Sequence, residues 1–292
     1  MGLIQRECSG PLLKFVKAHK IFDLMRTGIA AGDILPCLRK NEIHFYEGGA
    51  CLFRFRPRSV STHRQYIDCE GKGYRALSGH EHDLTTFDRV RAKARKHRIE
   101  DKSNELAAVH GLFSAFSITR SDHKHGELAL IDIEARFGKD DVNGLPIKMI
   151  DLVFLMPDQH VLFVEAKCMG NSDVGSSGMA KVEAQVEYYQ RHIRHTSVLD
   201  AINYSIKIQL QLINRKTAEI SLNIFRRVPI LLLDPSDPKR QIGPRNTWLR
   251  ERLCKAYDWT IDSERPLVID GTSDAFGAIG AFVEKFSGSR VH

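Results

Sequence analysis

The sequence predicts an α/β protein in which helices flank a central mixed β-sheet, preceded by an N-terminal α+β extension. Two apolar runs, 149–156 and 161–166, are separated by turn-forming residues and predict a strand hairpin. The continuous apolar run 228–233 ends at Asp-Pro, which is typical of a buried strand in an α/β sheet. Helical spacing of apolar residues over 179–195 and 198–214 predicts two helices that cover this sheet.

Length and charge narrow the class of protein. The chain has 292 residues, enough for one large domain or for a core domain with an appendage. Its net charge is +7 and its pI is about 9.1, so an anionic partner is favoured, and nucleic acid is the commonest. A basic surface without a partner is the alternative.

Cysteine usage and hydropathy indicate the compartment. The six cysteines form no CxxC pair and show no zinc-ligand spacing, so we expect free thiols in a reducing cytoplasm. The N-terminus has no apolar signal core, and no run of about 18 apolar residues is present to span a bilayer. We therefore expect a soluble, cytoplasmic protein with no membrane partner.

The N-terminal part combines helices with a hairpin. Apolar spacing over 10–30 predicts one or two amphipathic helices, and Gly48-Gly49 predicts a hairpin between strands at 42–46 and 50–55. Arginines then alternate with Phe55, at positions 54, 56 and 58, so a phosphate-binding face with Phe55 turned to the core is one interpretation. The alternative is a solvated edge strand whose charges discourage aggregation. Residues 59–84 are expected to be irregular.

A one-signed basic run precedes the expected catalytic region. Six of the ten residues 89–98 are Lys or Arg, on an expected helix, and phosphate binding needs such clusters. A solvated helix face is the alternative. The residues that we expect to contact nucleic acid are Arg89, Arg91, Lys93, Arg95, Lys96 and Arg98. A boundary near residue 99 divides the chain into an N-terminal region, 1–98, and a domain at 99–292.

The second region continues with alternating elements. A helix is expected at 105–116 and a strand at 127–137, whose Asp132 and Glu134 fall on one side, which fits a solvent-facing side best. After the hairpin and the two long helices, we expect a helix at 247–257, a strand at 267–269 and a closing helix at 275–286.

Three ionisable residues, Asp151, Glu165 and Lys167, interrupt the apolar runs of the hairpin. Glu165 and Lys167 are two apart on one strand and so share a face. Buried charges are costly without a partner or a metal, which marks a candidate site. Two carboxylates suit Mg²⁺ or Mn²⁺, and a lysine beside them suits phosphodiester hydrolysis. The alternative is a structural cluster in which Lys167 neutralises the two acids.

The hairpin loop decides whether Asp151 can join that face. A four-residue loop, 157–160, places Asp151 opposite Ala166 and therefore on the other face from Glu165. A joint site requires a loop with an odd number of residues, or a bulge near Asp151.

These residues carry a family resemblance. Asp151, followed after thirteen residues by Glu165-Ala166-Lys167, resembles the PD-(D/E)xK nuclease superfamily, also called restriction-endonuclease-like, whose order α-β-β-β-α-β resembles the elements expected over 103–233. Gln185 and Tyr189 resemble the QxxxY motif of the RecB-like branch, and four residues apart they share a helix face. The chain departs from the pattern at Ile150, where the family usually has proline.

The resemblance implies a metal-dependent deoxyribonuclease. It implies that the metal ion, Mg²⁺ or Mn²⁺, is bound by Asp151, Glu165 and Glu105, that Lys167 positions the nucleophile, and that Gln185 and Tyr189 assist. Glu105 as a helix-start acid favoured by the dipole is an alternative, as are Asp132 or Glu134 as third ligand and Gln185 and Tyr189 as plain surface residues.

The biological setting stays open at this level. Defence against foreign DNA (restriction) and DNA repair both fit, and RNA is an alternative substrate. The rival class is a nucleic-acid-binding or assembly protein on a nuclease fold that no longer cleaves. For residues 1–98, DNA recognition, homodimer formation and contact with a partner are all open.

Overall fold

A computed structural model describes residues 8–100, 109, 112, 114–124, 126–135, 149–168, 179–193, 196–216, 221–233, 268–270 and 274–287. The chain is an α/β protein that divides into two compact units. The first unit comprises residues 4–123 and 200–220, and the second comprises residues 1–3, 124–199 and 221–292. The units therefore divide at 123/124 rather than near residue 99, and residues 200–220 join the first unit.

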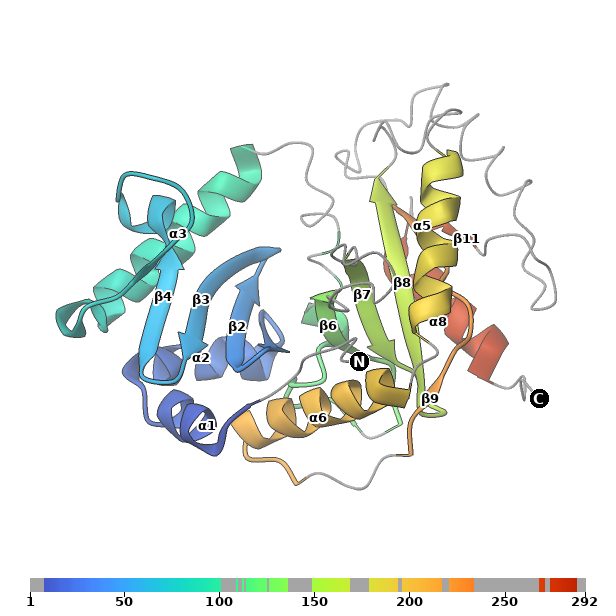
Figure 1. Cartoon of the computed structure of the whole chain (residues 1–292), viewed down its shortest axis with the longest axis horizontal. Coiled ribbons are helices and arrows are strands. Elements are labelled where there is room, and N and C mark those ends of the chain that lie inside the picture. Colours follow the sequence, from blue (N-terminus) through green and yellow to red (C-terminus); the bar gives the residue numbers. More distant parts are fainter. Residues whose placement is uncertain are drawn as a thin grey trace. The chain divides into compact units, whose positions relative to one another are not determined.

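The first unit contains a five-stranded antiparallel sheet whose strands follow one another in chain order (Figure 1). Its strands are β1 (Ile34–Arg39), β2 (Glu42–Glu47), β3 (Ala50–Arg56), β4 (Ser59–His63) and β5 (Tyr74–Ala76). Gly48 and Gly49, with φ of 63° and 81°, form the expected β2–β3 turn, because a two-residue type I′ turn needs positive φ at both positions. The expectation of an irregular stretch at 59–84 is wrong for β4 and β5.

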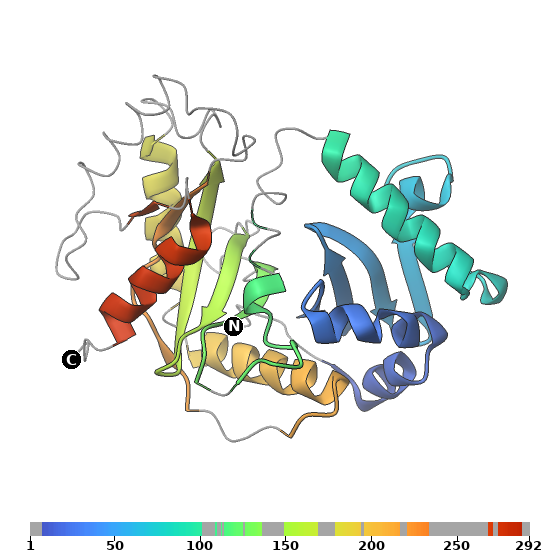
Figure 2. The same cartoon turned by 180° about the vertical axis from the view of Figure 1, so that it is seen from behind.

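Helices cover one face of this sheet (Figure 2). They are α1 (Gly10–Lys17), α2 (Lys20–Ala31), α3 (Leu84–Glu100) and the part of α6 (Thr196–Leu212) from residue 200 onward, with short 3₁₀ turns η1 (Arg64–Ile67) and η2 (Gly79–Glu81). Ser9 accepts from the Leu12 amide to begin α1, and Gly32, with φ of 85°, ends α2.

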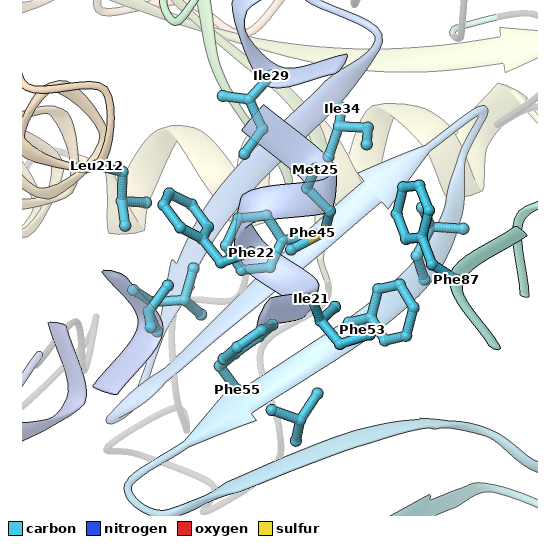
Figure 3. Packing of buried hydrophobic residues seen from close by; sticks show 14 of the residues in the cluster. Ile21, Phe22, Met25, Ile29, Ile34, Phe45, Phe53, Phe55, Phe87 and Leu212 are labelled. Atoms are coloured by element: carbon cyan, nitrogen blue, oxygen red, sulfur yellow. The ribbon is translucent and has the colours of Figure 1, made fainter. Parts of the chain in front are cut away.

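The core of the first unit lies between α2 and the sheet (Figure 3). Phe45 of β2 packs on Phe22 of α2 and on Phe55 of β3, and Phe53 of β3 stacks on Phe87 of α3. Phe22, Phe45, Phe53 and Phe55 are fully buried. Each such side chain contributes about 2 to 3 kcal/mol by leaving water. This packing explains why Phe55 faces inward and its arginine neighbours do not.

The second unit contains a six-stranded mixed sheet in the order β11-β10-β8-β7-β6, with β9 also pairing with β8. Strands β6, β7 and β8 are antiparallel neighbours, whereas β9 and β10 run parallel to β8, and β11 runs parallel to β10. The strands are β6 (Ala129–Ala135), β7 (Ile150–Leu155), β8 (His160–Cys168), β9 (Asn223–Ile224), β10 (Ile230–Leu233) and β11 (Val268–Asp270). Its described helices are α5 (Met179–His192) and α8 (Ala275–Ser287).

Most elements expected from the sequence are present. The two N-terminal helices, the hairpin, both long helices, the strands near 230 and 268, and the closing helix are confirmed. Of the helix expected at 105–116, Val109, Leu112 and residues 114–116 are helical, while Glu105 lies outside the described residues. The helix expected at 247–257 also lies outside them.

Two findings bear on the cysteines and on hydropathy. Cys8, Cys37, Cys51, Cys69 and Cys168 form no disulfide bond. Among the described residues, no helix has both the length and the apolar character needed to cross a membrane.

Candidate active site

The loop between β7 and β8 has three residues, which gives the odd number that a shared site requires. The Met156 amide donates to the His160 carbonyl at 2.8 Å, so that Pro157, Asp158 and Gln159 form the loop. Pro157 favours the turn, and Gln159 adopts a positive φ of 68°, as three-residue hairpins demand at their last position. The loop has one residue fewer than the four expected from the sequence. This shift of one residue turns every side chain of β7 to the opposite face of the sheet from the face that a four-residue loop would give.

The register of the hairpin places Asp151 on the face of Glu165. Leu152 pairs with Val164 and Val153 with Phe163, and one step further along, Asp151 falls opposite Glu165. Just beyond the end of the ladder, the Ala166 amide donates to the Asp151 carboxylate at 2.9 Å. The carboxylate thus satisfies a strand amide and is held toward β8.

Lys167 lies between the two carboxylates. Its ammonium donates to Glu165 Oε1 at 2.6 Å and to the Ala166 carbonyl at 3.0 Å, and it lies 3.8 Å from Asp151 Oδ2. The side chains of Glu165 and Lys167 are 1% and 8% exposed, and that of Asp151 is 25% exposed. Among the described residues, these two acids and one ammonium sum to a net negative charge, and Asp151 is the most exposed of the three.

Helix α5 holds the Glu165 carboxylate from the other side. Gln185 donates through Nε2 to Glu165 Oε1 at 2.6 Å and to the Tyr189 hydroxyl at 2.5 Å. The Tyr189 hydroxyl in turn donates to the Met149 carbonyl at 2.6 Å, immediately before β7. Burial, and next the negative charge of Glu165, raise the pKa of Tyr189, so its hydroxyl stays protonated as a donor. The plain-surface interpretation of Gln185 and Tyr189 is wrong, since Tyr189 is fully buried.

The donor set fits a divalent cation through two carboxylates. Asp151 and Glu165 offer hard oxygens, and the cationic ammonium of Lys167 already lies between them. No group of three or more His, Cys, Asp or Glu side chains suited to a metal occurs in the described part of the chain. A bound Mg²⁺ or Mn²⁺ held by these two acids would keep several waters, as Mg²⁺ commonly does.

Strand β6 brings another acid to the site face. Asp132 lies opposite Val153, whose side chain shares a face with that of Asp151, and a register shift between Leu130 and Asp132 marks a bulge there. Asp132 is only 1% exposed, and its carboxylate accepts from the Ile133 amide at 2.8 Å. The expectation that Asp132 faces solvent is therefore wrong. Apolar residues on both sides of it in the sequence were the signal that could have indicated burial.

Three of the six basic residues of the run 89–98 in α3 form ion pairs within the first unit. Arg91 binds both oxygens of Glu47, at 2.6 and 2.7 Å, and Arg95 binds the same carboxylate at 2.6 Å. Lys93 pairs with Asp68 at 2.8 Å. Arg89 and Lys96 are exposed, and the Arg98 side chain lies outside the described residues. Nucleic-acid contact by this run stays a prediction, and two of its arginines already have a structural role.

A scan against protein-family models, a search of curated proteins and a search of solved structures each gave no match. The chemistry of this site is therefore inferred from its own geometry.

Proposed function

We propose that the chain is a divalent-metal-dependent nuclease that hydrolyses phosphodiester bonds, with DNA as its substrate, on a restriction-endonuclease-like core. One observation carries the proposal: Asp151, Glu165 and Lys167 converge on one sheet face, with the Lys167 ammonium 2.6 Å from one carboxylate and 3.8 Å from the other. Two carboxylates and a lysine in this arrangement are suited to metal-assisted phosphodiester hydrolysis.

The order of elements supports the proposed core. A helical segment ending at Phe116 is followed by the antiparallel strands β6, β7 and β8, the helices α5 and α6, and strand β10 parallel to β8. Apart from the second helix α6 and the short strand β9 before β10, this order is the α-β-β-β-α-β order that the resemblance implies. The β7–β8 hairpin lies in the middle of the sheet, where β7 and β10 flank β8.

The residues of the chain have distinct proposed roles. A divalent cation, when bound, acts as a Lewis acid on the phosphate and lowers the pKa of a water. Asp151 and Glu165 would hold it; Glu105, which the resemblance implies as a third ligand, lies outside the described residues. Lys167 would donate from its ammonium to the attacking water or to a phosphate oxygen. Gln185 fixes the Glu165 carboxylate by its hydrogen bond, and Tyr189 fixes Gln185.

The test is cleavage by the full chain. Linear, circular and single-stranded DNA, and RNA, are incubated with Mn²⁺, with Mg²⁺ and with EDTA. The variants are Asp151→Asn, Glu165→Gln and Lys167→Ala, and Glu187→Gln on the exposed side of α5 is the matched control. We expect metal-dependent DNA cleavage that falls at least about 100-fold in the three site variants and persists in the control. Cleavage that survives in Asp151→Asn and Lys167→Ala would refute the assignment.

Metal titration separates the nuclease from a binding protein that no longer cleaves. Calorimetric titration of Mn²⁺ into the chain should give a binding isotherm that is lost in Asp151→Asn and Glu165→Gln. A protein that binds nucleic acid but shows neither Mn²⁺ affinity nor cleavage would be the rival, non-catalytic module.

A further inference from the structure

The sheet of the first unit has a second face, opposite to the one that its described helices cover. Strand pairs Arg54↔Ser61, Arg56↔Ser59 and His63↔Tyr74 share one side of the sheet, opposite to the side of Phe53 and Phe55. We call this side the polar face, defined by Glu42, Arg54, Arg56, Ser61, His63 and Tyr74. Arg56 is exposed, while Arg54, His63 and Tyr74 are half-buried. Because β3 is the third of five strands, these arginines lie on a central strand and the edge-strand interpretation is wrong.

An arginine side chain and two aromatic rings contact one another on the polar face. The Arg54 guanidinium lies over the Tyr74 ring, 3.3 Å from its centroid, and the His63 ring meets that ring edge-on at 5.4 Å. Arg54 Nε is buried and makes no hydrogen bond within the described structure. The Tyr74 ring lies against the guanidinium, and Cys51 also interacts with the Arg54 side chain. A guanidinium stacked on one aromatic ring can stack a second planar group on its other side.

The charge of the face is positive. Glu42 is its acid, and it is shared between Arg56 Nε at 2.7 Å and His44 Nε2 at 2.8 Å. Arg54 and Arg56 on the face, with the exposed Arg58 in the following turn, outweigh that one carboxylate. An excess of guanidinium beside stacked rings is complementary to a phosphate chain that carries planar bases.

The geometry points to a single-stranded nucleic acid as the ligand of the polar face. An unpaired base would stack on the Arg54–Tyr74 pair, and phosphates would contact Arg56 and Arg58. A duplex cannot supply this contact, because its bases are already stacked on each other. Binding at the polar face is independent of the cleavage chemistry of the second unit.

The test measures binding by the full chain in EDTA, so that no cleavage occurs. Fluorescence anisotropy is recorded with a labelled 15-mer of thymidylate, a 15-mer of uridylate and a 15-base-pair duplex, each at several salt concentrations. We expect tighter binding of the single strands than of the duplex. The two single-stranded probes distinguish DNA from RNA as the better ligand.

Matched variants locate the binding site. Tyr74→Leu should weaken single-strand binding about tenfold through lost stacking, while Tyr74→Phe, which keeps the ring, should bind as the parent does. Arg56→Ala should weaken binding and reduce the salt slope by about 0.7. Arg26→Ala is its control, because Arg26 is similarly exposed (49% against 58%) and also paired with an acid, Asp23, at 2.9 Å.

Several outcomes would overturn the inference. These are parent-like binding by Tyr74→Leu, an equal loss in Arg26→Ala and Arg56→Ala, or duplex binding as tight as single-strand binding. Thermal unfolding of each variant shows that it is folded. A chain that binds in EDTA but never cleaves with metal would refute the proposed nuclease alone, whereas a cleaving chain with unaffected polar-face variants would refute this inference alone.

Discussion

The carboxylate of Asp151 accepts a hydrogen bond from the backbone amide of Ala166, at 2.9 Å, directly beyond the point where the β7–β8 ladder ends. One side chain thus terminates strand pairing and presents a charge beside Lys167. The two tasks need different properties of the residue, an acceptor oxygen for the amide and a negative charge for the site, so they can be separated by mutation.

Asp151→Asn keeps an acceptor oxygen and removes the charge. We expect unfolding stability close to that of the parent and loss of Mn²⁺ binding and cleavage. Asp151→Ala removes both, leaves the Ala166 amide without this acceptor and should lower the free energy of unfolding by about 1 to 3 kcal/mol. Urea unfolding and the cleavage assay check the pair. Equal destabilisation by both variants would contradict the amide role.

Tyr189→Phe removes the hydroxyl that links Gln185 to the Met149 carbonyl. Because both hydrogen bonds are part-buried, we expect a loss of about 1 to 2 kcal/mol in unfolding stability. Cleavage should fall less than in Lys167→Ala, since Tyr189 acts by holding Gln185. Glu187→Gln, on the exposed side of the same helix, is the control. Full stability in Tyr189→Phe would show that the hydroxyl relay contributes nothing.

Glu47→Gln tests the double arginine contact of the first unit. Burial, the largest effect, would raise the pKa of Glu47, but the hydrogen bonds of Arg91 and Arg95 outweigh it and leave that pKa lowered. The variant should lose about 2 to 4 kcal/mol of unfolding stability at pH 7, because two guanidinium groups lose a buried anion. Asp68→Asn, which breaks only the exposed pair with Lys93, should destabilise the fold much less, because exposed ion pairs are screened by solvent.

The same shift gives Glu47 a defined pH dependence. A carboxyl whose pKa is lower in the folded than in the unfolded chain stabilises the fold above the unfolded value of 4.5, and this stability is lost as pH falls below it. The stability difference between parent and Glu47→Gln should therefore shrink as the pH is lowered below about 4.5. A difference that is constant with pH would argue against the charged contact.

Acid should weaken the first unit through His19 as well. Burial and then the nearby His82 lower the pKa of His19 to about 4, against the opposing effect of Asp23. The unfolded chain binds the proton near pH 6.5, so the stability contributed by neutral His19 falls as pH decreases from 6.5 toward 4. The slope is at most about 1.4 kcal/mol per pH unit.

His19→Asn checks this pH dependence. Asparagine can also accept at the start of α2, where His19 Nδ1 accepts from the Ile21 amide, and it does not titrate. Urea unfolding at pH 7, 6 and 5 should give a flatter dependence for this variant, while replacement of the exposed His80 by asparagine should leave the dependence unchanged. An unchanged slope in His19→Asn would refute the assignment.

The sequence indicated the candidate site residues but not all of their surroundings. The charges within the apolar runs marked Asp151, Glu165 and Lys167, because a charge on a buried strand is costly unless it has a partner or a metal. Asp132 was misjudged, since alternation along one strand cannot tell which neighbouring strand covers it. The sequence did not predict strands β1, β4 and β5. Strand β5 has only three residues, and strands β1, β4 and β5 are each stabilised by pairing with neighbouring strands, which local sequence does not reveal.

By itself, the sequence determined the hairpin strands, the two long helices and the pairing of Glu165 with Lys167 on one face, because strand alternation and helix periodicity are local properties. The tertiary structure alone decided that the loop has three residues and that Asp151 therefore turns toward Glu165. It also decided that Glu47 forms ion pairs with Arg91 and Arg95 of the basic run. These outcomes depend on register and on contacts between distant segments, and a shift of one residue reverses them.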